Sequence, residues 1–154
     1  MELQIEHLTK KYGEKVALRD FTYTFTPGIY GILGANGAGK STLMNLITDN
    51  VKRNEGQILW DGTDILKLGK NFRGKLGYMP QQQGMYTHFP ARRFLTYIAA
   101  LKGMDKKTAA EEVEKAAAMV NMTDVLDKRL GTYSGGMKQR ILIAQAILGS
   151  PKIL

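Results

Sequence analysis

The stretch that decides the fold lies at residues 34–41, which read Gly34-Ala35-Asn36-Gly37-Ala38-Gly39-Lys40-Ser41. It matches the pattern G-x-x-x-x-G-K-[S/T] of a phosphate-binding loop. Residues 29–33 before it are apolar at nearly every position, which predicts a strand buried on both faces, and residues 40–48 after it predict a helix. A loop that joins such a strand to a helix is the context in which this pattern indicates a phosphate site.

Each part of the loop has a chemical task. Glycines allow backbone amides to turn inward around a diphosphate, and the helix N-terminus behind them attracts anions. We expect Lys40 to contact the β- and γ-phosphates, Ser41 to bind Mg²⁺ and Thr42 to add a hydroxyl near the α-phosphate. The alternative is a flexible glycine turn that contains an ordinary lysine, and the strand-to-helix context disfavours it. The candidate nucleotide-binding residues of the loop are Gly34, Ala35, Asn36, Gly37, Ala38, Gly39, Lys40, Ser41 and Thr42.

Secondary-structure signals elsewhere are shorter. Alternating or apolar runs predict strands at residues 3–8, 21–25, 57–60 and 76–79. From Phe89 onward the apolar spacing is helical; Thr108 and Glu111 fit a capping box, and Ser134 and Gly149 mark the ends of a last helix. The chain shows no linker, repeat or low-complexity run, so we draw no domain boundary.

A second glycine-containing stretch reads Tyr133-Ser134-Gly135-Gly136-Met137-Lys138-Gln139-Arg140. A serine N-cap followed by two glycines exposes a hydroxyl and amides at the positive end of a helix, which is a second anion site. Taken alone it could be an ordinary capped helix. Downstream of a phosphate-binding loop, it closely resembles the L-S-G-G-Q signature of ATP-binding cassette (ABC) ATPases, with Tyr133 and Met137 in place of the consensus Leu and Gln. This form most resembles the cassettes of bacterial drug, antibiotic and sodium exporters.

The resemblance implies an α/β fold of the ABC type of P-loop NTPase. Its parts would be an N-terminal antiparallel β subdomain, a truncated RecA-like core and a helical signature subdomain, within one partial nucleotide-binding domain at residues 1–154. In this family the signature meets the γ-phosphate held by a partner subunit, so the resemblance implies a head-to-tail dimer with two ATP molecules. The residues that would make this contact are Ser134, Gly135, Gly136 and Met137.

Two further segments are similar to the family. Gly77-Tyr78-Met79-Pro80-Gln81 resembles its glutamine loop, in which Gln81 would bind Mg²⁺ and position the attacking water; a polar turn after a strand is the alternative. Lys11-Tyr12-Gly13 resembles the segment whose aromatic ring stacks on adenine, although Tyr12 could equally be a half-exposed loop tyrosine. Residues 85–104 resemble the part that docks a transmembrane permease.

In the family the signature helix is followed by an aliphatic strand that ends in Asp-Glu, the Walker B residues. There the Asp holds Mg²⁺ through water and the Glu polarises the attacking water. The sequence ends at Leu154, inside the corresponding strand. The resemblance therefore implies an N-terminal fragment that binds ATP and Mg²⁺ without hydrolysing ATP, and in which residues 29–33 form an unpaired strand.

Composition limits the function further. The 154 residues include no cysteine and carry a net charge of +8, and the sequence holds no apolar run long enough to span a membrane. We expect a cytoplasmic protein, peripheral to the inner face of the cell membrane through a permease partner. No tract interleaves basic and aromatic residues, so no nucleic-acid partner is expected. A soluble ABC ATPase that acts on ribosomes or DNA, and an inactive remnant, remain the alternatives.

Overall fold

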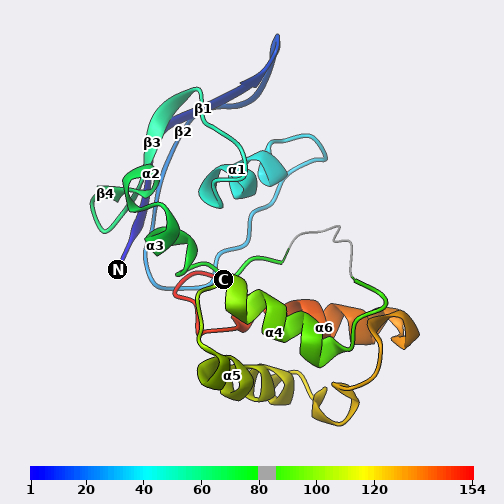
Figure 1. The fold of residues 1–154 in the computed structure, drawn as a ribbon. Helices are drawn as coiled ribbons and strands as arrows, with labels where there is room; N and C mark the ends of the chain where they lie inside the picture. The colour runs from blue at the N-terminus through cyan, green and yellow to red at the C-terminus, as the bar shows by residue number, and fades with distance from the viewer. Residues whose placement is uncertain (80–85) are drawn as a thin grey trace. The chain divides into compact units, whose positions relative to one another are not determined.

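The computed structural model describes residues 1–79 and 86–154, which form two compact units, Met1–Arg73 and Gly74–Leu154 (Figure 1). The first unit contains the sheet and the second contains the three longest helices of the described chain. No change in composition marks the boundary between Arg73 and Gly74. The two units are therefore defined by how the chain packs, and no linker in the sequence separates them.

The first unit holds a four-stranded antiparallel sheet in the order β2-β1-β3-β4 (Figure 1). Its strands are β1 (Leu3–Tyr12), β2 (Lys15–Phe25), β3 (Glu55–Trp60) and β4 (Thr63–Asp64). The strands predicted at residues 3–8, 21–25 and 57–60 are confirmed. β1 and β2 continue beyond the predicted alternation to a hairpin turn at Gly13, whose φ is +57°.

A bulge interrupts the alternation of β1. Leu3 and Ile5 are buried, and the next buried apolar residue is Leu8, because the pairing register shifts between Ile5 and Leu8. His7 lies in this shift with a φ of +50°. A Cβ at Gly56 on β3 would come within 2.4 Å of the His7 carbonyl oxygen, so the bulge requires glycine opposite it.

Three helices complete the first unit: α1 (Lys40–Ile47), α2 (Ile65–Leu68) and α3 (Lys70–Arg73). α1 begins at Lys40, as the phosphate-loop pattern predicts, and buries Leu43, Leu46 and Ile47. The apolar spacing of α1 thus fixes which side of the helix is buried.

The strand predicted at residues 29–33 is wrong. The segment has no regular secondary structure, and Ile29 and Leu33 are fully exposed, at 104% and 94%. An apolar run becomes a buried strand only where neighbouring strands supply hydrogen-bond partners and cover its faces. Within the described residues no strand pairs with this segment.

In the second unit, α4 (Ala91–Leu101), α5 (Lys106–Met119) and α6 (Gly135–Ile147) pack against one another (Figure 1). Two short 3₁₀ turns, η1 (Thr123–Val125) and η2 (Leu130–Thr132), connect α5 to α6. The shared core includes the large buried side chains Phe94, Leu95, Val113, Leu126, Leu130, Ile141 and Leu148. No helix in the described ranges is long and apolar enough to cross a membrane.

Helix starts in this unit confirm one prediction and correct another. Ser134 is the N-cap of α6, as predicted, and its hydroxyl accepts the Met137 amide. α5 instead begins earlier than the capping box at Thr108 and Glu111 implies. Its N-cap is Asp105, whose carboxylate accepts the amides of Lys107 and Thr108, and Thr108 lies inside the helix. A carboxylate at the first free amides displaces the later threonine from the capping role.

The strand predicted at residues 76–79 is reduced to a single parallel bridge between Leu76 and Ile153. Gly77 next to it is buried, and a Cβ there would lie 2.1 Å from the carbonyl oxygen of Ala146 in α6. The backbone at Gly77 therefore lies directly against the last turns of the signature helix.

Candidate functional site

The phosphate-binding loop runs without regular secondary structure into α1. Asn36 and Gly37 occupy a turn, closed by the Ala38 amide, which donates to the Ala35 carbonyl at 3.2 Å. The Leu43 amide donates to the Gly39 carbonyl at 2.8 Å and closes the first turn of α1. The first amides of a helix have no intrahelical acceptor, so this turn presents free donors beside the exposed loop.

Gly39 is required on two grounds. It is the N-cap of α1 with a φ of +92°, in the left-handed region that side chains rarely adopt. A Cβ at this position would also lie 2.4 Å from the carbonyl oxygen of Ala17 in β2. The end of the loop thus lies directly against the backbone of β2, and this contact fixes the position at which α1 begins.

The side chain of Lys40 reaches back across the loop. Its Nζ donates to the carbonyl oxygens of Gly34, at 2.6 Å, and Ala35, at 2.8 Å. No acidic residue occupies the first turn of α1, so the ammonium and the helix N-terminus concentrate positive charge at the loop without a local counter-charge. This arrangement suits a polyphosphate, which would give Lys40 charged oxygens in addition to the two carbonyls.

The other predicted ligands of the first unit are accessible. Ser41 is exposed and Thr42 half-buried at the start of α1. Tyr12 is 47% exposed beside the β1–β2 turn, where it pairs with Lys15, and the Lys10 ammonium lies 4.8 Å from its ring centroid. Gln81 falls in residues 80–85, outside the described ranges. Among the residues that are described, no cluster of three or more acidic or histidine side chains could hold a metal.

A cation at the loop would therefore need ligands other than a cluster of carboxylates. The hydroxyl of Ser41 is an oxygen donor of the kind that Mg²⁺ prefers, and phosphate oxygens of a bound nucleotide would supply the remainder of its coordination. The chemistry of the loop thus fits a metal that arrives with the nucleotide.

The signature stretch is exposed at the start of α6. Ser134, Gly135 and Gly136 are all exposed, and a Cβ on either glycine would meet no atom within 4 Å. Met137 is half-buried and packs against the helical core, and its contact with a nucleotide stays a prediction. At the start of α6, the Ser134 side chain and the backbone of residues 134–136 thus remain open to solvent.

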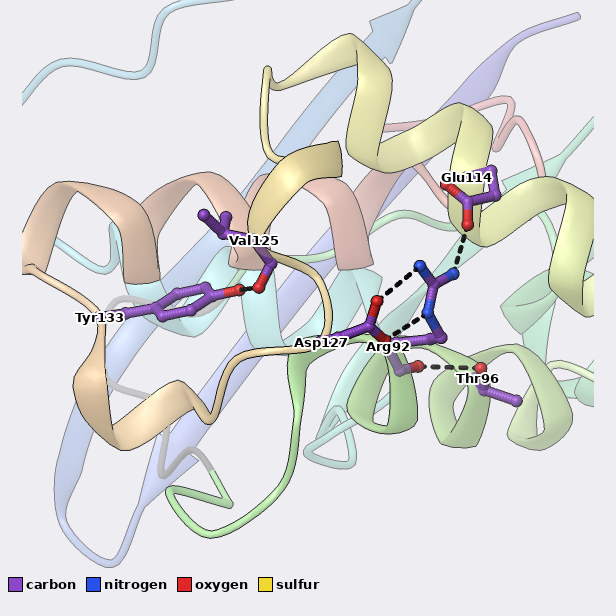
Figure 2. Close-up of polar contacts among 6 residues, drawn as sticks. All are labelled: Arg92, Thr96, Glu114, Val125, Asp127 and Tyr133. Atoms are coloured by element: carbon purple, nitrogen blue, oxygen red, sulfur yellow. Dashed lines mark hydrogen bonds and ion pairs between the residues drawn. The ribbon is translucent and has the colours of Figure 1, made fainter.

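Tyr133, which replaces the consensus leucine, is buried in the core at 4% exposure. Its hydroxyl donates to the Val125 carbonyl at 2.5 Å (Figure 2). Burial, with a smaller contribution from the nearby Asp127 carboxylate, raises the pKa of the Tyr133 hydroxyl. Tyr133 thus fills a buried position and makes a hydrogen bond to η1 that a leucine could not make.

Sequence reasoning missed a charged cluster that joins Arg92 on α4 to Glu114 on α5 and to Asp127 after η1 (Figure 2). The Arg92 guanidinium donates to both carboxylate oxygens of Asp127, at 2.7 and 3.2 Å, and to Glu114 on α5. Its hydrogen bonds, first to Asp127 and then to Glu114, raise the pKa of Arg92, and the same contact lowers the pKa of Asp127. The partners lie 35 and 22 residues away in sequence, so no local pattern signals them.

Lys102 is a second side chain that the sequence does not single out. At the end of α4 its ammonium donates to the Leu148 carbonyl at 2.7 Å and more weakly to the Leu76 carbonyl at 3.4 Å. Burial lowers the pKa of Lys102. The side chain thus joins the end of the signature helix α6 to the backbone beside Gly77.

An aromatic surface covers part of α4 and the segment before it. Tyr86, Phe89, Arg93 and Tyr97 line a shallow pocket of about 370 Å³. The rings of Tyr86 and Phe89 stack with centroids 5.2 Å apart, and the Arg93 guanidinium lies 4.3 Å from the Phe89 centroid. Exposed aromatic rings beside an arginine are typical of surfaces that bind another protein.

Comparisons with known proteins agree with this geometry. A family model described as "ABC transporter" matches residues 18–154. The chain is 34% identical over 153 residues to the uncharacterized ABC transporter ATP-binding protein YhaQ of Bacillus subtilis, covering 99% of the chain and 50% of that relative. It thus spans about half the length of the curated relatives it matches.

Two solved structures are similar to the chain. One is a putative ABC transporter ATP-binding protein of Pyrococcus furiosus, with a TM-score of 0.75 and 28% identity over 96% of this chain and 70% of its own. The other is the ADP conformation of an ATP-binding cassette of an ABC transporter, with a TM-score of 0.82 over 99% of this chain and 67% of its own. At 24% identity the second comparison establishes the fold alone. By its matched family, its relatives and its ABC ATPase fold, the chain belongs to the ABC transporter ATP-binding proteins.

Proposed function

We propose that the chain binds Mg-ATP through residues 34–42, as the nucleotide-binding subunit of an ABC transporter. The observation that carries the proposal is the position of Lys40, whose ammonium bridges the two carbonyls at the loop entrance beside a helix N-terminus without acidic residues. In this position Lys40 would contact the β- and γ-phosphates, while the amides at the start of α1 would bind the remaining phosphate oxygens.

Other roles in the first site follow from residue chemistry. Ser41 would bind the Mg²⁺ that accompanies ATP, and Thr42 would add a hydroxyl near the α-phosphate. The exposed ring of Tyr12 would stack on adenine. Gln81 would complete the metal site and position the attacking water. When bound, Mg²⁺ neutralises phosphate charge.

The second anion site supports a dimer. Glycine weakens a helix interior by about 1 kcal/mol relative to alanine, and Gly135 and Gly136 occupy the first two positions of α6 without the helix propensity of alanine. No contact in the described chain requires Gly135 or Gly136, because a Cβ at either position would meet open space. Glycine is favoured at such a position where another molecule approaches the backbone closely. We propose that this molecule is ATP held by the loop of a second cassette in a head-to-tail dimer.

A transmembrane permease is the proposed membrane partner. The exposed aromatic pocket on α4, formed by Tyr86, Phe89, Arg93 and Tyr97, supplies a surface for its docking segment. Such docking would hold the protein at the inner face of the cell membrane. In the whole protein, ATP hydrolysis would then be coupled to transport.

Titration of the chain with Mg-ATP tests the proposal. Lys40→Ala should weaken binding by about 1.5 to 3 kcal/mol, the scale of one charge-assisted contact. Lys67→Ala is the matched control, since Lys67 is an exposed lysine in the last turn of α2. Equal Mg-ATP affinity for the parent chain and Lys40→Ala, with both folded by circular dichroism, would refute binding at residues 34–42.

A further inference from the structure

We propose that Arg92 is a positioning residue for the signature. Through its contact with Asp127, it fixes residues 125–131 and thereby the place of Ser134 at the start of α6. The inference rests on the proposed function in one respect, namely that residues 134–136 form the second anion site. The positioning of Ser134 by Arg92 can be measured independently of that role.

The backbone before the signature depends on the start of α4 for its hydrogen bonds. The Arg92 amide donates to the Leu126 carbonyl at 2.9 Å, and the Leu130 amide donates to the Phe89 carbonyl at 2.9 Å. The Gly131 amide donates to the Thr87 carbonyl at 2.8 Å. Residues 126–131 thus run antiparallel to residues 87–92, although neither forms a regular strand. A segment held in this way moves with the α4 N-terminus.

The Arg92 side chain reinforces this backbone contact from the solvent side. Its guanidinium makes a two-pronged contact with Asp127, while its remaining nitrogen donates to Glu114 on α5 (Figure 2). The Asp127 side chain is 76% exposed, so a single ion pair there would contribute little in water. Two-pronged geometry is the case in which an exposed pair restrains its partner, and only arginine has the fork of donors it requires.

Two contacts carry the restraint from Asp127 to the signature. Tyr133 donates its hydroxyl to the Val125 carbonyl at 2.5 Å and its amide to the Leu130 carbonyl at 3.2 Å. Ser134 follows directly and caps α6 by accepting the Met137 amide at 3.3 Å. A displacement of residues 125–131 would therefore shift the serine that begins the helix.

Arg92 has two arms, and only one of them leads to the signature. The Glu114 arm joins α4 to α5, whereas the Asp127 arm joins α4 to the segment before Ser134. A purely structural role predicts that loss of either arm lowers stability in the same way. Positioning predicts that loss of the Asp127 arm alone loosens the signature.

Amide hydrogen exchange of the full chain, resolved by residue, distinguishes these cases. Asp127→Asn should increase exchange of the Leu130, Tyr133 and Met137 amides about 3- to 10-fold, because this exposed contact is screened by water and restrains local opening about as much as one ordinary hydrogen bond. Arg92→Lys should do the same, because lysine cannot replace the two-pronged contact.

The matched controls keep the Asp127 arm intact. Glu114→Gln removes only the charge on the other arm, and Lys115→Met breaks the exposed Lys115–Glu112 ion pair of α5. Both should leave the signature amides within about twofold of the parent, because each is a surface substitution that leaves the two-pronged Arg92–Asp127 contact in place. Equal exchange in Asp127→Asn and Lys115→Met would overturn the proposal. A uniform increase throughout α4, α5 and α6 would overturn it too, because it would indicate global destabilisation.

Sedimentation with Mg-ATP separates this inference from the proposed function. The parent chain should self-associate in Mg-ATP, and Asp127→Asn should weaken the association with Mg-ATP affinity unchanged. If the parent chain binds Mg-ATP but stays monomeric while Asp127→Asn still accelerates exchange at Met137, the positioning role stands and the proposed dimer fails. If the parent chain associates and Asp127→Asn associates equally well with unaltered exchange, the dimer stands and the positioning role fails.

Discussion

Gly39→Ala is the substitution whose cost follows most directly from the structure. A left-handed φ of +92° costs a residue with a side chain about 1–2 kcal/mol. The new Cβ would also lie 2.4 Å from the Ala17 carbonyl oxygen, far inside normal contact, and relieving such an overlap costs about 1–3 kcal/mol. If the loop keeps its place, the variant therefore loses about 2–5 kcal/mol of unfolding free energy.

Gly37→Ala is the matched control, because Gly37 has a φ of +86° with no atom within 4 Å of an added Cβ. It should lose only the backbone contribution, about 1–2 kcal/mol. Thermal unfolding by circular dichroism, at about 2–4 °C per kcal/mol for a chain of this size, measures the difference between the variants. If the loop moves away from Ala17 instead, Gly39→Ala should bind Mg-ATP more weakly than Gly37→Ala does. Equal unfolding temperatures together with equal affinities would refute the reasoning.

Three further predictions concern the hydroxyl of Tyr133, the ammonium of Lys102 and catalysis. Tyr133→Phe should lower the free energy of unfolding by about 1–2 kcal/mol in urea, because the Val125 carbonyl loses its donor; no change would contradict that contact. Burial lowers the pKa of Lys102, so between the lowered pKa and 10.5 the unfolded chain binds a proton that the folded chain has released. The free energy of unfolding should therefore rise with pH in that window, and Lys102→Met should abolish this rise. The purified chain should release no phosphate from ATP above background, since its 154 residues contain no aliphatic run ending in Asp-Glu; steady turnover abolished by Lys40→Ala would overturn this.

Local patterns predicted the features that depend on neighbours in sequence. The start of α1 at Lys40 and the cap of α6 at Ser134 are examples, because a helix start is set by residues within one turn of it. The strands β1 and β3 were also predicted, since alternation reports a half-buried strand wherever the pairing is regular. Alternation failed at His7, where a bulge changed the register.

Features that depend on distant partners could not be predicted. Residues 29–33 have the composition of a buried strand, yet strand pairing needs neighbours that the described residues do not supply. Met137 lies in the signature stretch, and only the packing of α6 shows that its side chain is partly buried against the helical core. Asp105 was overlooked in favour of Thr108 because both can cap a helix, and only the backbone path of the chain before α5 selects between them.

The sequence by itself determined the family and the two glycine-containing stretches, because phosphate binding requires particular residues at a fixed local spacing. Only the tertiary structure decided what holds those stretches in place. Gly39 lies against Ala17 of β2, and Arg92 joins Asp127 to α4. Both contacts connect residues at least 22 positions apart, which come together only when the chain packs, so no local pattern could have encoded them.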